Sequence, residues 1–207
     1  MIPVKPLLAL AALLCSACST SADVAAAPSR ATSPADANGP VDPNAEVDVA
    51  YFAGGCFWGV EHFLEQMDGV HEVESGYMGG HVDAPSYEDV LTHDSGHLEA
   101  VRVRFDPSRV SYEAVAKRFF EIHDPTQANG QGPDIGNQYL SAVFFTSDAQ
   151  KTATEGLIAA LRTRGYDVVT ELRPAAKFWP AEGYHQNYYA SNGKTPYCHG
   201  RVRRFGD

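Results

Sequence analysis

Two cysteines carry the chemistry that this sequence could perform. The chain has 207 residues and four cysteines, of which Cys15 and Cys18 lie in an N-terminal apolar stretch. Cys56 and Cys198 remain for the folded part. Such a pair could form a structural disulfide, bind a metal or react. Neither lies in a C-x-x-C spacing, so a zinc site would need histidines from distant parts of the chain.

The surroundings of Cys56 favour a reactive thiol. Cys56 lies in the stretch GCFWGVE, after an apolar run over residues 49–53 and the pair Gly54 and Gly55. From Phe57 onward apolar residues recur at helical spacing, which predicts a strand, a glycine turn and a helix. Because the N-terminus of a helix stabilises an anion, we expect a lowered pKa for the Cys56 thiol.

A carboxyl group at Glu99 is the second candidate. Residues 97–105, HLEAVRVRF, alternate strictly and predict a strand with two faces. Glu99 shares a face with Val101, Val103 and Phe105. If that face is the core, burial should raise the pKa of Glu99 and keep it available as a proton donor. The alternative is that Glu99 lies at the frayed start of the strand and reaches water.

The remaining patterns predict one mixed sheet flanked by helices in a single α/β (α+β) domain. Apolar periodicity predicts a strand at 70–77, a helix after Ser111, a strand at 139–145, a helix at 148–164 and a strand at 168–172. The Gly- and Asn-rich stretch up to Gly136 is a candidate binding loop. The coil-rich segment from residue 178 onward places Cys198 in a mobile coil.

The N-terminal part predicts export. Residues 1–17 carry one lysine and an apolar run too short to span a bilayer, which is typical of a signal peptide. The sequence CSAC resembles a bacterial lipoprotein cleavage site with Cys18 as the lipidated residue; cleavage near residues 20–22 is the alternative. We therefore expect a periplasmic protein, anchored by lipid in the bacterial envelope, with a flexible tether at 18–47 and a domain at 48–207.

The amino-acid composition restricts the kinds of partner that this protein can bind. The formal net charge is -10, which argues against a nucleic-acid surface. Nothing in the sequence suggests an obligate oligomer, so we expect a monomer that meets the membrane only through its lipid.

The motifs resemble those of the peptide methionine sulfoxide reductase A family. GCFWGVE is followed in order by GYMGG, SYEDV, GHLEAV, GPDIGNQY, FWPAEGYHQNYY and YCHGR. This resemblance covers residues 48–205. It implies a ferredoxin-like core and a reduction, without cofactor or metal, of the S epimer of methionine sulfoxide, free or in oxidised proteins.

The same resemblance implies roles for individual residues. Cys56 would attack the sulfoxide sulfur and Glu99 would protonate its oxygen, with Tyr87 and Tyr139 as hydroxyl donors to that oxygen. Cys198 would resolve the resulting sulfenic acid as a disulfide. No cysteine follows it in the sequence, so a thioredoxin-like dithiol would reduce that disulfide directly.

The resemblance also implies a substrate pocket. Phe57 and Trp58 would hold the S-methyl group of the substrate, and Asp134 would orient its backbone or a bound water. His185 is expected to be structural rather than reactive.

Two other classes of protein stay open on the residues alone. A Cys-His hydrolase would also need a thiol of low pKa, and histidines are available as bases: His93, His97, His123, His185 and His199. A non-enzymatic exported domain with a structural disulfide would use the same two cysteines.

Overall fold

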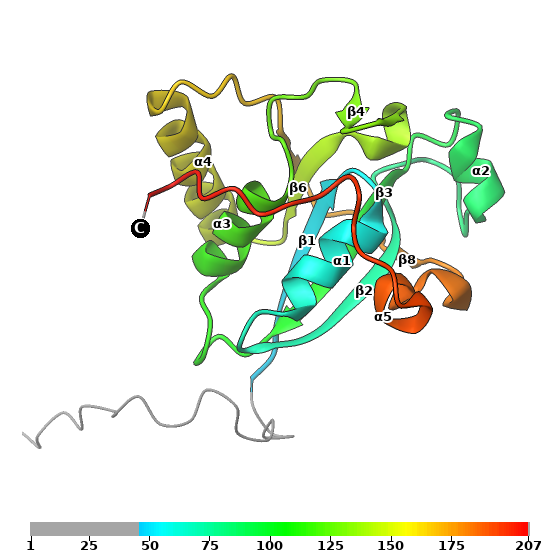
Figure 1. The fold of residues 1–207 in the computed structure, drawn as a ribbon, viewed down its shortest axis with the longest axis horizontal. Coiled ribbons are helices and arrows are strands. Elements are labelled where there is room, and N and C mark those ends of the chain that lie inside the picture. The colour runs from blue at the N-terminus through cyan, green and yellow to red at the C-terminus, as the bar shows by residue number, and fades with distance from the viewer. Residues whose placement is uncertain (1–45, 207) are drawn as a thin grey trace, which may run out of the picture. The chain divides into compact units, whose positions relative to one another are not determined.

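The computed structural model describes residues 46–206, which form a six-stranded sheet with helices packed on it and a separate two-stranded sheet (Figure 1). The strands are β1 (Asp48–Gly54), β2 (Val70–Met78), β3 (Leu98–Phe105), β4 (Gly130–Gln131), β5 (Asp134–Ile135), β6 (Ser141–Phe145), β7 (Glu171–Pro174) and β8 (Trp179–Pro180). The helices are α1 (Phe57–Glu65), α2 (Tyr87–Leu91), α3 (Tyr112–Ile122), α4 (Asp148–Thr163) and α5 (Tyr188–Asn192), with the 3-10 turns η1 (Asn137–Tyr139) and η2 (Gly183–His185).

The large sheet has the strand order β7-β6-β1-β3-β2-β8. β6 and β7 pair in parallel and the other neighbours pair antiparallel, which confirms the predicted mixed sheet. The inner order β6-β1-β3-β2, with α1 after β1 and α3 after β3, is that of a ferredoxin-like βαββαβ unit. No helix within residues 46–206 is long and apolar enough to cross a membrane.

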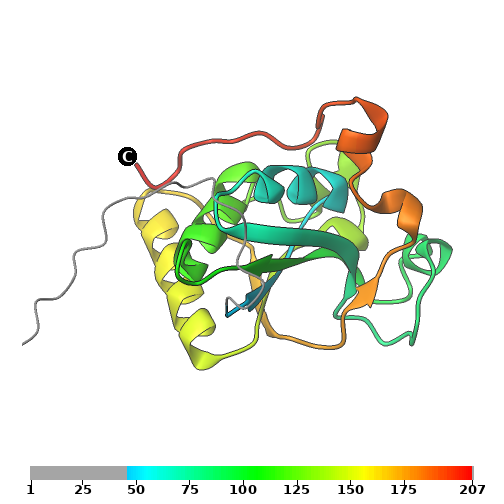
Figure 2. The ribbon, with the colours of Figure 1, turned by 90° about the horizontal axis from the view of Figure 1, so that it is seen from below.

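The main core lies between one face of the sheet and the helices α1, α3 and α4. Its fully buried members include Phe52 of β1, Leu64 of α1, Phe119 of α3 and Leu161 of α4. A smaller cluster on the opposite face contains Met78, with the segment before β8 packed against it. Figure 2 shows that segment, in orange, on the side of the sheet away from α1.

Several predicted elements differ in their limits. The stretch before Gly136 is not an open loop, because β4 and β5 form a small hairpin there. The strand predicted at 168–172 begins only at Glu171, since the backbone N–H of Val169 pairs with the carbonyl of Pro125 outside the sheet. Tyr139 ends η1 instead of opening β6.

Candidate active site

Cys56 lies at the turn between β1 and α1, as predicted. Gly55 before it has a φ of +95°, which favours glycine, and a Cβ at that position would lie 2.3 Å from Cβ of Gln131. The carbonyl of Cys56 accepts a hydrogen bond from the N–H of Gly59 over 3.1 Å and so opens the helix. The side chain is 7% exposed. The turn therefore holds the thiol at a fixed point beside the hairpin of β4 and β5.

The thiols of Cys56 and Cys198 lie side by side. Both are free and buried, and the side chain of each shifts the pKa of the other. A disulfide can form only between thiols that are neighbours in the fold, as these two are. The structure thus brings together the two cysteines that the sequence singles out.

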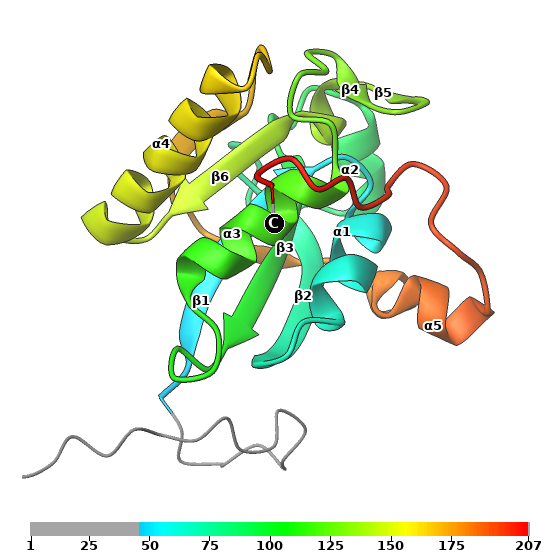
Figure 3. The same cartoon turned by 60° about the vertical axis from the view of Figure 1, so that its left-hand side comes forward.

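The segment around Cys198 is coil, as predicted, and hydrogen bonds and an ion pair connect it to the rest of the domain. The carbonyl of Cys198 accepts a hydrogen bond from Nε2 of Gln131 over 3.3 Å. The N–H of Val202 donates to the carbonyl of Glu121 over 2.7 Å, and the Arg201 guanidinium pairs with the Glu121 carboxylate at 2.9 Å. Figure 3 shows the C-terminal segment, in red, running along α3. These contacts with α3 and the hairpin hold Cys198 in place.

The negative charge of the thiol pair is more stable on Cys198 than on Cys56. The neighbouring side chain of Cys198, together with burial and the nearby Glu99, raises the pKa of the Cys56 thiol. The side chain of Cys56 and the contact with His199 lower the pKa of Cys198 to about 6, although burial opposes them. The predicted lowering at Cys56 is therefore wrong for the paired thiols. The backbone N–H of Trp58 acts in the predicted direction but is outweighed.

Glu99 lies on the buried face of β3, as predicted. Its side chain is 2% exposed, and Oε2 accepts a hydrogen bond from the N–H of Phe57 over 3.0 Å. Burial raises the pKa of Glu99 to about 8, and the nearby Asp134 and Cys198 add to this rise, while the hydrogen bond from Phe57 opposes it. Near neutral pH the carboxyl therefore keeps its proton, as a general acid must.

Tyr87 and Tyr139 place two hydroxyl groups near the same carboxyl. The two side chains influence each other's pKa, and both interact electrostatically with Glu99 and Cys56. Burial raises the pKa of Tyr139 and raises that of Tyr87 to about 12. Both hydroxyls therefore remain protonated at neutral pH and can donate hydrogen bonds.

Aromatic rings surround the start of α1. The Phe57 ring is 1% exposed, with its centroid 5.0 Å from that of His185. Trp58 is half-buried, stacks on Tyr188 with centroids 3.6 Å apart, and donates from Nε1 to Nδ1 of His185 over 3.2 Å. His185 is thus held among rings, in keeping with a structural role. The part of Phe57 and Trp58 in substrate binding stays a prediction.

Asp134 links the small hairpin to the segment before Cys198. Its two carboxylate oxygens accept hydrogen bonds from the hydroxyl of Tyr197, over 3.0 and 3.1 Å. Asp134 also acts electrostatically on Glu99 and Cys198, raising the pKa of each. Its predicted role in orienting a substrate stays a prediction.

Two residues that have no role in the predicted reductase site contact its members. Glu182 accepts hydrogen bonds from the hydroxyl of Tyr77 and the N–H of Tyr87, each over 2.8 Å. Nδ1 of His199 lies 3.0 Å from Sγ of Cys198. In the sequence His199 is one of five candidate bases of a hydrolase, and it is the residue directly after Cys198.

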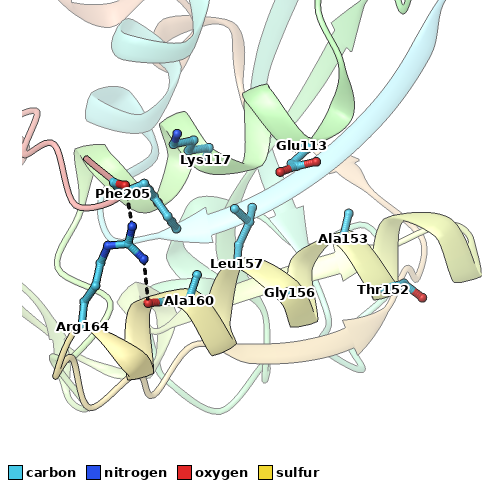
Figure 4. A pocket seen from close by; sticks show the side chains of 9 residues that line it. All are labelled: Glu113, Lys117, Thr152, Ala153, Gly156, Leu157, Ala160, Arg164 and Phe205. Atoms are coloured by element: carbon cyan, nitrogen blue, oxygen red, sulfur yellow. Dashed lines mark hydrogen bonds between the residues drawn. The ribbon is translucent and has the colours of Figure 1, made fainter. Parts of the chain in front are cut away.

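A surface pocket of about 440 Å³ lies elsewhere, between α3, α4 and the C-terminal segment (Figure 4). Its lining residues are Glu113, Lys117, Thr152, Ala153, Gly156, Leu157, Ala160, Arg164 and Phe205. They include neither cysteine, so this pocket does not belong to the thiol site. In the part of the chain that the structure describes, no three His, Cys, Asp or Glu residues gather as metal ligands.

Known proteins resemble this chain over the region that carries both cysteines. A family model described as peptide methionine sulfoxide reductase matches residues 48–206. The peptide methionine sulfoxide reductase MsrA of Acinetobacter baumannii (strain AYE) is 48% identical over 149 residues, which is 72% of this chain and 86% of that protein.

Two solved structures of methionine sulfoxide reductases or related proteins are also similar to this chain. The crystal structure of Mxr1 from Saccharomyces cerevisiae in reduced form is 33% identical, with a TM-score of 0.69 over 77% of this chain and 92% of that one. The structure of methionine sulfoxide reductase A of Corynebacterium diphtheriae is 31% identical, with a TM-score of 0.64 over 71% of this chain and 76% of that one.

Proposed function

The chain belongs to the peptide methionine sulfoxide reductase family, and we propose that it reduces the S epimer of methionine sulfoxide through a thiol cycle on Cys56 and Cys198. Methionine sulfoxide, free or in oxidised proteins, is the substrate, and methionine is the product. The observation that carries the cycle is the contact of the two free thiols beside the buried Glu99.

The first step transfers the sulfoxide oxygen to Cys56. A proton passes from Cys56 to the neighbouring Cys198, which leaves a thiolate on Cys56. This thiolate attacks the sulfoxide sulfur while Glu99 gives its proton to the oxygen. Cys56 becomes a sulfenic acid and methionine leaves, so the substrate sulfur gains the two electrons that the Cys56 sulfur loses.

The hydroxyl groups of Tyr87 and Tyr139 support this step. Negative charge grows on the sulfoxide oxygen before its bond to sulfur breaks, and fixed donors stabilise that charge. Phe57 and Trp58 would receive the methyl group of the substrate beside Cys56, and Asp134 would orient the substrate backbone or a bound water.

The second step closes the cycle. Sγ of Cys198 attacks the sulfenic sulfur of Cys56, the bond from sulfur to oxygen breaks, and the oxygen leaves as water. A thioredoxin-like dithiol then reduces the disulfide with two electrons and two protons. No part of this cycle calls for a metal or an organic cofactor.

A quench of pre-reduced protein with the separate sulfoxide epimers tests the proposal. Without added reductant, the S epimer should yield a single methionine per chain and the R epimer none. Cys198→Ser should still give that methionine, whereas Cys56→Ser should give none. A protein that forms no methionine from either epimer would contradict the proposed reaction.

The same variants separate the reductase from its alternatives. In a Cys-His hydrolase, loss of Cys198 would scarcely change turnover. In a binding domain with a structural disulfide, Cys56→Ser and Cys198→Ser would destabilise the fold equally and methionine sulfoxide would not react.

We propose further that the protein is an exported, periplasmic monomer anchored through a lipid on Cys18. This rests on the apolar run and the CSAC sequence, which lie outside the described residues. Mass spectrometry of the membrane fraction should find a diacylglyceryl group on Cys18. A soluble chain with an unmodified N-terminus near Asp23 would contradict the anchor, and light scattering would test the monomer.

A further inference from the structure

His199 is a buried imidazole directly against the sulfur of Cys198. Its Nδ1 lies 3.0 Å from Sγ of Cys198, and its Nε2 lies 2.7 Å from the carbonyl oxygen of Gly54. A carbonyl oxygen only accepts hydrogen bonds, so Nε2 carries a proton. In the neutral ring, Nδ1 therefore presents a lone pair to Cys198.

Glycines in the cysteine motif provide the space for this ring. A Cβ at Gly59 would lie 2.1 Å from Nδ1 of His199, and a Cβ at Gly55 would lie 3.4 Å from its Cε1. Gly59 is in the first turn of α1, where its own backbone does not require glycine. The close approach of His199 explains why this position lacks a side chain.

We propose that His199 is the base that activates Cys198 for attack on the sulfenic acid of Cys56. This inference rests on the proposed thiol cycle and assigns its second step. The proton of the Cys198 thiol moves to Nδ1 of His199, and the Cys198 thiolate bonds to the Cys56 sulfur. The sulfenic oxygen leaves with its own hydrogen, takes that proton from Nδ1 and departs as water. The Cys198 sulfur is oxidised as the Cys56 sulfur is reduced.

Other titratable groups around the pair are engaged elsewhere. His123, at the end of α3, contacts the carbonyl of Phe119 and the hydroxyl of Ser141 through its two ring nitrogens, and burial lowers its pKa to about 3. Glu99 accepts a hydrogen bond from the backbone N–H of Phe57, and it donates its proton in the first step of the cycle.

Asp134 completes the set of charged groups near Cys198. It binds the hydroxyl of Tyr197, and its charge raises the pKa of the thiol. His199 acts in the opposite direction, in agreement with a base that receives the proton of Cys198.

The test follows the sulfenic acid of Cys56 in full-length protein. Pre-reduced protein is mixed with methionine (S)-sulfoxide, and methionine, disulfide and dimedone-trapped Cys56 are measured over time. In wild type, the disulfide should form as fast as methionine, with little trapped Cys56. In His199→Gln, disulfide formation should slow about 100-fold, the scale of general base catalysis, and trapped Cys56 should accumulate.

Two readouts separate a base from a merely structural ring. In the variant, the rate of disulfide formation should rise about tenfold per pH unit up to the ordinary pKa of a thiol, whereas wild type should keep its rate at pH 6 to 7. In His199→Ala, added imidazole should restore disulfide formation.

Gly59→Ala keeps the imidazole but displaces it, and should also accumulate the sulfenic acid.

The outcomes distinguish this inference from the proposed function. If wild type forms no methionine, the thiol cycle itself fails. If methionine forms but His199→Gln and Gly59→Ala close the disulfide as fast as wild type, with the same pH profile, His199 is not the base.

Discussion

Phe57 donates its backbone N–H to Oε2 of Glu99 over 3.0 Å, so the first peptide group of α1 contacts the buried carboxyl. This donor favours the ionised carboxylate, but burial favours the protonated form and prevails, which gives the pKa of about 8. The start of the helix thus fixes the acid beside Cys56 without removing its proton.

The first prediction is that Glu99→Gln lowers the single-turnover rate about 100-fold, because the amide keeps an oxygen for Phe57 but has no acidic proton. The concentration of sulfoxide at half-maximal rate should change little. Rapid-quench measurement of methionine checks both. In wild type the rate should fall as pH rises through about 8, where Glu99 loses its proton, and this fall should be missing in the variant. An unchanged rate would exclude Glu99 as the acid.

The second prediction concerns the hydroxyl pair. Tyr87→Phe and Tyr139→Phe should each lower the single-turnover rate about 10-fold, because the remaining hydroxyl still donates to the developing charge. The double variant should lose more than the product of the two single effects. Single-turnover rates of all four proteins give this coupling. Purely multiplicative effects would mean that the two hydroxyls act on separate features.

The position of Glu99 could be predicted because a strand has a strict period of two. The face of Glu99, Val101, Val103 and Phe105 in the sequence is the face that packs in the main core. Apolar periodicity does not predict the short helix α2, although Ser86 and Asp89 form the capping box at its start. Five residues are too few to show helical periodicity.

The placement of Cys198 could not be predicted in the same way. Residues 197–206 form no helix or strand, so no periodicity reveals their contacts. They are held by hydrogen bonds to carbonyls of α3, by the ion pair of Arg201 with Glu121, and by Gln131. Such contacts join parts of the chain that are distant in sequence. His199 is likewise distant in sequence from Gly54 and Gly59, so its contact with them could not be predicted either.

The third prediction is that Glu182→Ala destabilises the fold and slows the reaction. The hydroxyl of Tyr77, whose side chain is fully buried, would lose its acceptor, which costs about 1–3 kcal/mol. The N–H of Tyr87 would also lose its partner, so the first turn of α2 should loosen and the rate should fall. Urea unfolding and single-turnover kinetics measure the two effects.

A control variant removes the hydroxyl of Tyr77, which Glu182→Ala leaves without its acceptor. Tyr77→Phe in the Glu182→Ala background should recover part of the free energy of unfolding but not the rate, because Tyr87 stays released. Recovery of both would place the whole effect of Glu182 on Tyr77.

The last prediction is a pH dependence of stability that arises at Glu61, in the cysteine motif. This carboxyl is 1% exposed, and burial raises its pKa from 4.5 to about 7, while N–H groups of Asn187 and Tyr188 oppose the rise. Below pH 4.5 both the folded and unfolded states hold the proton. Between pH 4.5 and 7 the unfolded state releases it more readily, so stability is lost as pH rises, by up to about 3 kcal/mol.

Glu61→Gln should flatten this part of the pH profile in urea unfolding of the reduced protein, whereas the exposed Glu113→Gln should leave it unchanged. Equal slopes for Glu61→Gln and wild type would show that Glu61 keeps its ordinary pKa in the folded protein.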